Sequence, residues 1–363
     1  MRLQEIKLVN FRKHPELTFA PSDGINLLYG PNGSGKTNIL EAVHYCALAK
    51  GLNKSLDREC LTFETNYFLL RSRFVDETGV EVFVKVSYEK ASDKRIHVNS
   101  EELKKYSGLI GRIPCITFSP VEMSIINGSP QERRRFTDNA LSQTNKRYLE
   151  DLLQYRRVLQ QRNALLAESA DRGTESGSLG VWTEKLSMLA GSIISSRLEF
   201  FDRLLVHLEQ IYKEIGLGEV PGFIYMPSFG KLLSKTSDED ISRIMMQRLG
   251  EIGSREIYRR QTLLGPHRDD IVFRINDVEI KKYASQGQIR TFLIALKLAL
   301  QRFVREFTGE PPIFLLDDLF SELDRKRVGK VLQLLEGAGQ SIITATETQD
   351  IEGVHCIAVS ELA

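Results

Sequence analysis

The sequence has few cysteines and no long apolar run. Its four cysteines lie far apart among 363 residues, with no C-x-x-C pair. They fit neither a disulfide framework nor a zinc site, so we expect buried free thiols in a reducing cytosol. The start of the chain has no apolar core of signal-peptide length, and the longest apolar stretches are broken by Lys297 or too short to cross a bilayer. We therefore predict a cytoplasmic protein with no membrane partner.

An excess of charge of one sign is also missing. The formal net charge is +1, so any nucleic-acid surface must be a local patch, and charge alone predicts no polyanion partner. Apolar residues make up 42% and charged residues 27%, which is ordinary for a soluble globular protein. A chain of 363 residues is long enough for two domains, or for one large domain with an insertion.

A complete phosphate-binding motif is present near the N-terminal end. Residues 30–37 read Gly-Pro-Asn-Gly-Ser-Gly-Lys-Thr and match G-x-x-x-x-G-K-[ST] between a predicted strand (24–29) and a predicted helix. Glycines let backbone N–H groups approach phosphate oxygens, and a helix N-terminus adds a favourable dipole. We expect Lys36 to reach the β- and γ-phosphates of ATP and to be catalytic, and the Thr37 hydroxyl to ligate Mg²⁺. The predicted nucleotide-binding residues are Gly30, Pro31, Asn32, Gly33, Ser34, Gly35, Lys36 and Thr37.

A pair of carboxylates follows a short apolar strand. The segment Ile-Phe-Leu-Leu at 313–316 ends in Asp317 and Asp318. A buried strand of this kind delivers Asp317 to the edge of a sheet, where it can hold Mg²⁺, and places Asp318 to orient the attacking water as a catalytic residue. The alternative is a plain helix cap after a strand, which is common by itself. The complete phosphate loop favours the magnesium site.

A third motif indicates the subclass. Ser285, Gln286, Gly287 and Gln288 precede a predicted long helix (287–307) and lie about thirty residues before Asp317. At this point the chain resembles the ABC-type ATPases, whose signature (commonly Leu-Ser-Gly-Gly-Gln) occupies this place, and residues 321–324 are similar to the loop that follows their acidic pair. In that superfamily the signature caps the γ-phosphate of ATP bound to the other subunit. The resemblance therefore implies that residues 285–288 bind ATP in trans and that ATP joins two heads.

The pattern between the motifs predicts the architecture. Segments 66–75 and 80–88 read as an antiparallel hairpin, with a possible third strand at 95–99. From 130 to 260 the pattern is helical, and a heptad seam predicts an antiparallel helical arm. We predict an α/β ABC-type ATPase head, with a mixed phosphate-loop sheet and an antiparallel β subdomain, formed by residues 1–129 and 261–363, and a helical insertion at 130–260. The seam residues are Ile194, Leu198, Phe201, Leu205, Leu208, Tyr212 and Ile215.

Over nearly its whole length the chain resembles the RecF family of bacterial recombination-repair ATPases, which are related to the SMC and Rad50 heads. The resemblance implies an ATP-dependent homodimer that binds gapped duplex DNA or single-strand/double-strand junctions and helps to load a recombinase. The contacts with DNA could be made to its single-stranded part or to its duplex part. The resemblance also implies cooperation with mediators of the RecO and RecR type. The matching segments are 8–12, 30–37, 118–120, 128–130, 133–138, 264–270, 285–288 and 315–324.

Two departures from the ABC pattern predict slow ATP hydrolysis. Many ABC ATPases have glutamate where this chain has Asp318, and the aspartate side chain is one methylene shorter. A displacement of about 1 Å can reduce the rate of a reaction about 10²-fold. Residues 344–347, at the place of the usual switch histidine, contain no histidine. We expect a weak, DNA-stimulated ATPase that acts as a timer.

Other functions stay open at this stage. An ABC transporter motor and an SMC-like tether share the signature, although the helical insertion argues against the first and its shortness against the second. A small-molecule kinase would need no residues 285–288. Basic clusters at 133–135, 156–157, 259–260, 267–268 and 281–282 could contact DNA phosphates, or could form ion pairs within the chain.

Overall fold

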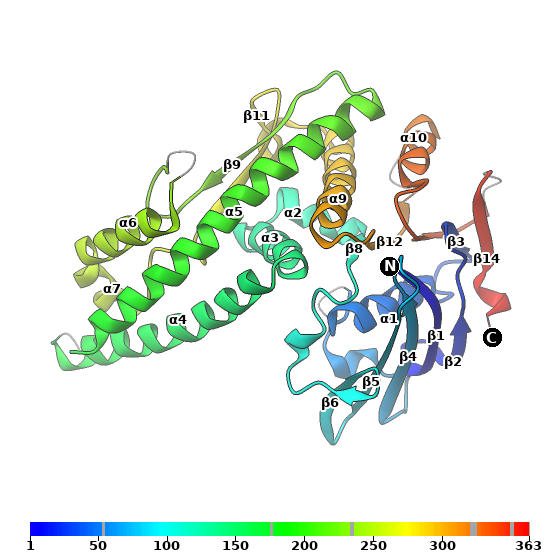
Figure 1. Cartoon of the computed structure of the whole chain (residues 1–363), viewed down its shortest axis with the longest axis horizontal. Helices are drawn as coiled ribbons and strands as arrows, with labels where there is room; N and C mark the ends of the chain where they lie inside the picture. The colour runs from blue at the N-terminus through cyan, green and yellow to red at the C-terminus, as the bar shows by residue number, and fades with distance from the viewer. Residues whose placement is uncertain (53–54, 175–176, 233–235, 320–324, 349–351, 363) are drawn as a thin grey trace. The chain divides into compact units, whose positions relative to one another are not determined.

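The computed structural model describes the whole chain except residues 53–54, 175–176, 233–235, 320–324, 349–351 and 363. The chain forms two compact units, which can be followed by colour in Figure 1. We call the first the head unit; it consists of Met1–Met123, Gln210–Gly218 and Ser285–Ala363. The second, the helical unit, consists of Ser124–Glu209 and Glu219–Ala284.

These bounds differ from the predicted domains at both joins. Residues 261–284 belong to the helical unit because they contain strand β10 (Asp270–Ile275), which pairs with β9 (Pro221–Met226) of the same unit. Residues 210–218 belong to the head unit, where the Tyr212 ring lies 6.2 Å from the Phe292 ring. Both assignments depend on contacts between segments distant in sequence.

The first sheet of the head unit is antiparallel. Its strand order is β2-β1-β4-β5-β6-β7, and every neighbouring pair is antiparallel. The predicted hairpin and third strand are confirmed as β4, β5 and β6, whereas β2 was not predicted. The strands are β1 (Arg2–Phe11), β2 (His14–Phe19), β4 (Tyr67–Val75), β5 (Glu81–Glu89), β6 (Ser92–Val98) and β7 (Glu101–Glu102).

The second sheet of the head unit is parallel and carries the nucleotide motifs. Its strand order is β14-β3-β13-β12-β8, with β3 (Ile25–Tyr29), β8 (Cys115–Phe118), β12 (Ile313–Leu316), β13 (Ser341–Ala345) and β14 (Val354–Ala358). Strands β12 and β13 are buried along their whole length, as continuous apolar runs in parallel sheets usually are. Because all five strands are parallel, the segments that follow β3, β8, β12 and β13 meet at one edge.

Helix α1 (Lys36–Leu48) lies between the two sheets. It contacts strands β1, β4 and β5 of the antiparallel sheet and β8, β12 and β13 of the parallel sheet. Every residue from Ile39 to Leu48 is buried, so the helix is covered on all sides, including at Glu41 and His44. The sequence predicted one apolar face, but the helix is enclosed because sheets pack on both sides of it.

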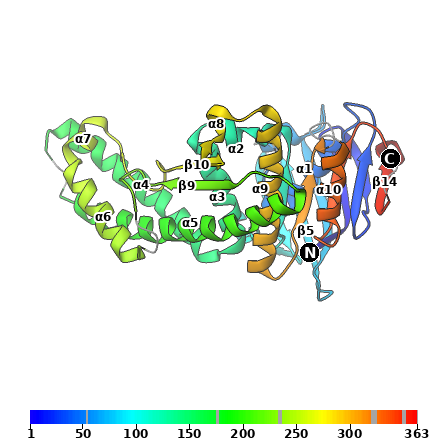
Figure 2. The ribbon, with the colours of Figure 1, turned by 90° about the horizontal axis from the view of Figure 1, so that it is seen from above.

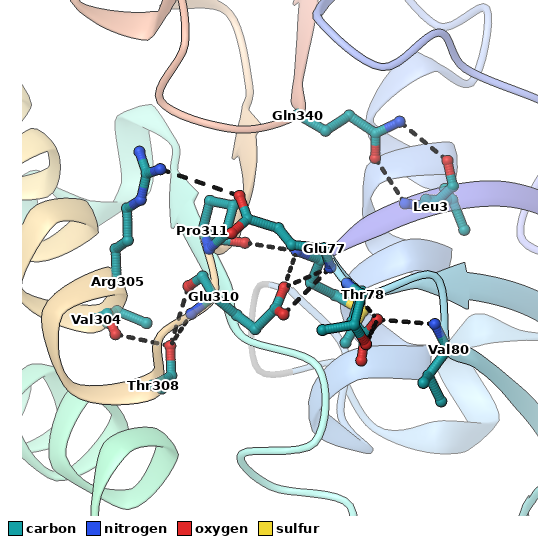
Figure 3. A network of polar contacts seen from close by, with 12 residues as sticks. Leu3, Glu77, Thr78, Val80, Val304, Arg305, Thr308, Glu310, Pro311 and Gln340 are labelled. Carbon is teal, nitrogen blue, oxygen red and sulfur yellow. Dashed lines mark hydrogen bonds and ion pairs between the residues drawn. The ribbon is translucent and has the colours of Figure 1, made fainter.

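A polar network joins the segments before β12 and β13 to the antiparallel sheet (Figure 3). Glu310, between α9 (Gln286–Thr308) and β12, accepts hydrogen bonds of 3.2 Å from the backbone N–H of Glu77 in the β4–β5 turn. Gln340 bonds the backbone of Leu3 in both directions, at 2.7 and 2.9 Å. These contacts join the connections of the parallel sheet to the antiparallel sheet, and so fix the two layers against each other.

The helical unit combines long helices with a small antiparallel sheet of order β11-β10-β9. The strand β9, within the segment predicted to be helical, was not anticipated. Both views place α6 and α7 beside the end where α4 ends and α5 begins (Figures 1 and 2). The elements are α2 (Ser124–Asn127), α3 (Pro130–Thr144), α4 (Lys146–Arg172), α5 (Leu179–Ile215, whose last six residues belong to the head unit), α6 (Asp238–Glu251), α7 (Gly253–Arg259), α8 (Ile280–Tyr283) and β11 (Val278–Glu279).

Helices α4 and α5 form the predicted antiparallel arm, but not through a strict heptad seam. Contacts in reversed order join them: Arg162 with Thr183 at 2.9 Å, then Asp151 with Ser192 at 2.6 Å. Leu198 and Leu205 of the predicted seam are only partly buried. Besides α4, residues of α3 and β9 contact α5, so its buried stripe is broader than a coiled-coil seam. The stripe includes Ile193, Ile194, Arg197, Phe200, Phe201, Leu204, Leu208 and Ile211.

One further helix and four 3-10 turns are described in the head unit. Helix α10 spans Arg325–Leu335, and 3-10 turns occur at Asp57–Cys60, Tyr106–Gly108, Pro120–Met123 and Val359–Glu361. Cys46, Cys60 and Cys115 are buried free thiols, and Cys356 is a partly buried one. Within the described ranges, we find no helix whose length and apolar character would suit a bilayer crossing.

Candidate nucleotide-binding site

Three glycines give the phosphate loop its shape. Gly30, Gly33 and Gly35 have φ angles of 154°, 78° and 100°, which residues other than glycine rarely adopt. At Gly35 a Cβ would also lie 2.4 Å from Nε2 of His14. This glycine therefore allows β2 to approach the loop closely. The loop follows β3 and leads into α1, as the sequence predicted.

Lys36 is the first residue of α1, and its ammonium group closes the loop. Nζ donates to the carbonyl oxygens of Gly30 at 2.7 Å and Pro31 at 3.0 Å. Burial lowers the pKa of Lys36, although the nearby carboxylates of Asp317 and Asp318 oppose that shift. The loop therefore carries a cation that is held by neutral carbonyl groups and not by a direct ion pair.

The start of α1 leaves donors for an anion. No side chain caps this helix at Gly35, so the first backbone N–H groups keep their capacity to bind phosphate oxygens. The hydroxyl of Ser34 is buried and has no hydrogen-bond partner among the described residues. An orphaned buried hydroxyl is costly unless a ligand satisfies it. Both features fit a phosphate group in the loop.

The predicted magnesium ligands lie next to each other. Oγ1 of Thr37 donates to Oδ1 of Asp317 at 2.8 Å, although the two residues are far apart in sequence. Oγ1 of Thr344 donates to the same carboxylate oxygen at 2.8 Å. A hydroxyl and a carboxylate are hard oxygen donors, and Mg²⁺ needs only one or two such protein ligands beside nucleotide oxygens and water. The residues present therefore fit Mg²⁺.

Asp318 occupies a strained backbone position beside this pair. Its φ of 52° is in the left-handed region, and its backbone N–H donates to Oγ1 of Thr344 at 2.9 Å. Thr344 therefore bridges both acidic residues. The sequence did not identify this threonine as part of the site; it was noted only for standing where other ABC ATPases have histidine.

These groups line one cavity of about 380 Å³ in the head unit. The structure thus brings together the loop, Asp317 and Asp318, and adds two segments that were not predicted as site residues. One follows β8 and the other spans the end of β13, and both reach the cavity because all parallel strands end at the same edge. The lining residues are Asn32, Gly33, Gly35, Lys36, Thr37, Asn38, Ser119, Pro120, Val121, Asp317, Asp318, Thr344 and Thr346.

The segment after β8 is held by a buried ion pair. Glu122 accepts from the backbone N–H of Ser119 at 3.1 Å, and Lys297 of α9 donates to the same carboxylate at 2.5 Å. The side chain of Lys297 is almost fully buried. Because α9 begins at the signature residues, this pair joins the signature helix to one wall of the cavity.

A second hollow of about 570 Å³ lies on the other side of the loop. Lys13 donates to the Gly33 carbonyl at 2.5 Å, and His14 approaches the Gly35 carbonyl at 3.1 Å. Burial lowers the pKa of His14, and the charge of Lys13 lowers it further. Nothing in the sequence analysis assigned Lys13 or His14 to the site.

The signature residues do not take part in this cavity. Residues 285–288 are absent from its described lining, and Ser285, Gln286 and Gly287 are exposed at the start of α9. Ser285 caps the helix: its hydroxyl accepts from the Gln288 N–H at 3.2 Å, and the Gln288 side chain accepts from the Ser285 N–H at 2.9 Å. Ser285 thus has a structural role in its own chain. Residues 321–324, the predicted loop after the acidic pair, lie outside the described residues.

Several basic clusters form ion pairs within the chain, which is the alternative left open above. Arg133 bonds Asp270 at 2.7 Å, and Arg260 bonds Asp171 at 2.7 Å. Lys282 on α8 bonds Glu279, the residue that precedes this helix, at 2.7 Å. Across the described part of the chain, no group of three or more His, Cys, Asp or Glu side chains could hold a metal ion.

The fold and this site define a class. A family model described as an AAA domain matches residues 5–217. The solved Smc head bound to the C-terminal winged-helix domain of ScpA aligns with a TM-score of 0.56 at 15% identity, covering 96% of this chain and 90% of that one. At that identity the likeness concerns the fold alone. The chain is an ABC-type ATPase head with an inserted helical arm.

Closer relatives define the family. The chain is 64% identical over 362 residues to the DNA replication and repair protein RecF of Chlorobium phaeobacteroides, covering 100% of both. It is 53% identical to that of Prosthecochloris aestuarii, covering 100% of this chain and 98% of the relative. The solved structure of the recombination mediator protein RecF-ATP in the RecFOR pathway aligns with a TM-score of 0.90 at 32% identity, covering 98% of this chain and 97% of that one. The chain belongs to the RecF family.

Proposed function

We propose that this chain is a cytoplasmic, ATP-gated DNA-binding protein of replication-fork maintenance and recombinational repair. Two heads close on ATP, with Lys36 and Asp317 from one copy and Ser285 from the other. One observation carries this proposal: the nucleotide cavity is complete except for the signature, which is exposed outside it at the start of α9. A second copy can supply what one chain leaves out of its own cavity.

In this mechanism the residues change partners when ATP enters. Lys36 leaves the carbonyls of Gly30 and Pro31 and donates to the β- and γ-phosphates, while the free N–H groups at the start of α1 bind phosphate oxygens. Thr37 and Asp317 would hold Mg²⁺, which would neutralise charge on the phosphates. Asp318 orients the attacking water, and residues 285–288 of the second copy cap the γ-phosphate.

We infer a slow, DNA-stimulated hydrolysis that releases the two heads. Asp318 has a short side chain, and its backbone is held in the left-handed region by the bond to Thr344. A carboxylate that cannot approach the water freely orients it poorly. Fast steady-state hydrolysis without DNA would contradict this part of the proposal.

The proposed partners follow from the family. A relative of known structure is named as a recombination mediator in the RecFOR pathway. We therefore propose mediators of the RecO and RecR type as partners, and gapped duplex or single-strand/double-strand junction DNA as the ligand, so that the bound dimer helps to load a recombinase. The DNA-contacting residues follow neither from the motif nor from the family name.

The test is a size-exclusion measurement with ATP, with ADP and without nucleotide, in the presence and absence of a gapped duplex. We expect ATP-dependent dimers that retain DNA, and the loss of both in Lys36→Met. Lys7→Met is the matched control, because Lys7 is an exposed lysine of the same unit on β1, outside the cavity. Dimers and DNA retention that persist in Lys36→Met, or a wild-type protein that stays monomeric with ATP and DNA, would refute the gating.

A further inference from the structure

The helical unit contains its own cavity of about 380 Å³, and its lining is strongly basic. Arg134 and Arg135 on α3, Arg156 on α4 and Arg197 on α5 line it, together with a single carboxylate, Asp138. Two of the segments matched to the family, 133–138 and 264–270, contribute to these walls. The nucleotide site accounts for neither segment.

Asp138, the one carboxylate of the lining, already accepts hydrogen bonds from two side chains. Asp138 accepts hydrogen bonds from Nη2 of Arg197 at 2.8 Å and from the Tyr148 hydroxyl at 2.6 Å. Its separation from Nη2 of Arg156 is longer, 3.5 Å. It therefore balances the charge of Arg197 and pairs more loosely with Arg156. Arg135 pairs at 3.2 Å with Glu132, which lies outside the lining, so the cavity keeps an excess of positive charge.

Arg134 is the least compensated of the four. It is half-buried, and its bond in the structure is to the backbone carbonyl of Asp269 at 2.6 Å. Among the described residues no carboxylate lies within ion-pair distance of its guanidinium group. Burial lowers the pKa of Arg134, and the charge of Arg197 lowers it further, although the group stays charged at neutral pH. The charges of Asp269, Asp270 and Asp138 oppose this lowering of the pKa. A half-buried guanidinium without a direct ion pair favours an anionic ligand.

Two inner residues of the cavity, Arg197 and His267, are held by hydrogen bonds, and the charge of Arg197 is balanced by Asp138. Arg197 is 1% exposed and donates to Tyr148, Asp138 and the Pro266 carbonyl, so its position is fixed. Nδ1 of His267 lies 2.7 Å from the Tyr155 hydroxyl. Burial, with the charges of Arg268, Arg134 and Arg197, lowers the pKa of His267 to about 4, so the imidazole is neutral at pH 7. The positive charge is thus concentrated on the arginines at the rim.

The fully exposed side chains of the lining are polar, and Leu159 is a half-buried apolar residue beside them. Gln131, Arg135 and Arg156 are exposed, whereas the apolar groups Leu152 and Pro266 are buried. A protein ligand normally needs an exposed apolar anchor at the centre of its site. Guanidinium groups bind phosphate through planar, paired hydrogen bonds, and phosphate has enough oxygens to accept from several arginines at once. The chemistry therefore favours phosphate over an acidic peptide.

We propose that this cavity binds a phosphate group, with Arg134, Arg135 and Arg156 as its ligands. The phosphate is supplied by a nucleic-acid backbone or by free inorganic phosphate; only the choice of nucleic acid rests on the proposed function. Bidentate contact gives Arg134 a direct ion pair, and the exposed side chains of Arg135 and Arg156 donate to the remaining oxygens.

The first measurement is DNA affinity at several salt concentrations, by fluorescence anisotropy with a labelled gapped duplex and the full chain. We expect Arg134→Gln and Arg156→Gln each to weaken binding by about tenfold. The slope of log K against log[salt] should become shallower by about 0.9 for each lost phosphate contact. The control is Arg157→Gln, which removes the same charge from an exposed neighbour on α4 that does not line the cavity. Equal losses in Arg156→Gln and Arg157→Gln would overturn a specific site.

The second measurement uses inorganic phosphate alone, with the thermal midpoint and isothermal titration as readouts. Phosphate should bind the wild-type protein and Arg157→Gln, and not Arg134→Gln. If phosphate binding depends on Arg134 while DNA affinity does not, the site is supported and its source is free phosphate. Failure of phosphate to bind, together with Arg134-dependent binding of a hexa-aspartate peptide, would overturn the proposal. Arg156→Gln changes only an exposed side chain, so a folding defect in Arg134→Gln does not remove the test.

The two proposals can fail separately. All measurements are repeated without nucleotide and in Lys36→Met, since the cavity belongs to the helical unit and needs no ATP. If ATP-dependent DNA binding is normal and insensitive to Arg134 and Arg156, and phosphate does not bind, only the cavity proposal fails. If ATP has no effect on dimers or DNA but the arginine variants lose phosphate binding, only the proposed gating fails.

Discussion

The head unit and the helical unit use their interior charges in opposite ways. In the head unit, the described residues give Lys36 two bonds, both to carbonyl oxygens of its own loop, and leave the hydroxyl of Ser34 without a hydrogen-bond partner. In the helical unit, Arg162 is 2% exposed and donates to Thr183, Thr262 and Glu256 at 2.6 to 2.9 Å. Spare hydrogen-bonding capacity distinguishes a ligand site from a scaffold.

The saturated pair also explains why basic residues in this sequence are hard to interpret. Glu256, fully buried, bonds Arg162 at 2.6 Å and accepts from the backbone N–H of Leu263 at 2.7 Å. A buried ion pair of this kind is costly to desolvate, and its worth depends on complete hydrogen bonding. An arginine in the helical unit can therefore be an internal part of the scaffold, and its position in the sequence does not distinguish it from an arginine that lines the cavity.

Breaking the internal ion pair should have the largest effect on the contrast. Arg162→Met leaves Glu256 as an unpaired buried charge, so we expect the free energy of unfolding of the helical unit to fall by about 3–5 kcal/mol. Chemical denaturation followed by Trp182 fluorescence, which reports on this unit, measures it. ATP binding by the head unit should survive.

Two comparisons control that experiment. Arg203→Met removes an exposed arginine that pairs with Glu199 at helical spacing, and should cost only about 0.3–0.5 kcal/mol. Replacing both Arg162 and Glu256 by methionine should restore much of the lost stability, since no charge is then buried alone. An Arg162→Met protein as stable as the wild type would contradict the scaffold role.

The head unit should be most sensitive at the glycine that β2 approaches. Gly35→Ala introduces a side chain at φ 100° and places Cβ 2.4 Å from Nε2 of His14, so we expect a loss of about 1–3 kcal/mol in stability together with loss of ATP binding. Gly33→Ala has φ 78° but no atom within 4 Å of its Cβ, and should cost only about 1 kcal/mol. Thermal midpoints and ATP titrations of the two variants separate the clash from the backbone strain. Equal effects would mean that the approach of His14 is unimportant.

Ser285 caps α9 and is also proposed to bind ATP in the second copy. Two substitutions separate these roles. Ser285→Ala removes the N-cap of α9 and should cost about 1 kcal/mol, whereas Ser285→Asn keeps a capping side chain and should cost little. If Ser285 also binds ATP in trans, both variants should lose ATP-dependent dimers. Dimers that persist in Ser285→Asn at wild-type ATP affinity would leave the residue with the capping role alone. Denaturation and size exclusion with ATP provide the two readouts.

The smallest expected effect is the loss of stability at low pH that one buried histidine in each unit should cause. Burial lowers the pKa of His44 in the head unit to about 3 and that of His267 in the helical unit to about 4. Below a pH of about 6.5 the unfolded chain therefore binds protons that the folded chain does not, so stability falls with pH down to those folded-state values. Each histidine should remove about 0.7 kcal/mol between pH 7 and 6. NMR titration of the imidazole signals checks this, and a midpoint near 6.5 for either would contradict it.

Local patterns in the sequence predicted most of the site, because its chemistry is local. The phosphate loop needs glycines, a lysine and a threonine at fixed spacing, and the apolar strand before Asp317 marks its own end. Strands β8, β9 and β14 escaped prediction because they are short and carry polar or glycine residues within partly apolar runs. Thr344 and the segment 119–121 enter the site only through the order of parallel strands, for which the sequence carries no local signal.

By itself, the sequence determined the class of protein and the phosphate-loop motif, and it predicted the residues that we propose to hold ATP and Mg²⁺. The tertiary structure decided which charges are satisfied: it buried Arg162 against Glu256, joined Thr37 and Thr344 to Asp317, and placed Arg134 in a cavity whose lining holds four arginines and one carboxylate, Asp138. The physical reason is that hydrogen bonding and ion pairing depend on distances between segments far apart in the chain, whereas backbone conformation and phosphate recognition depend on neighbouring residues.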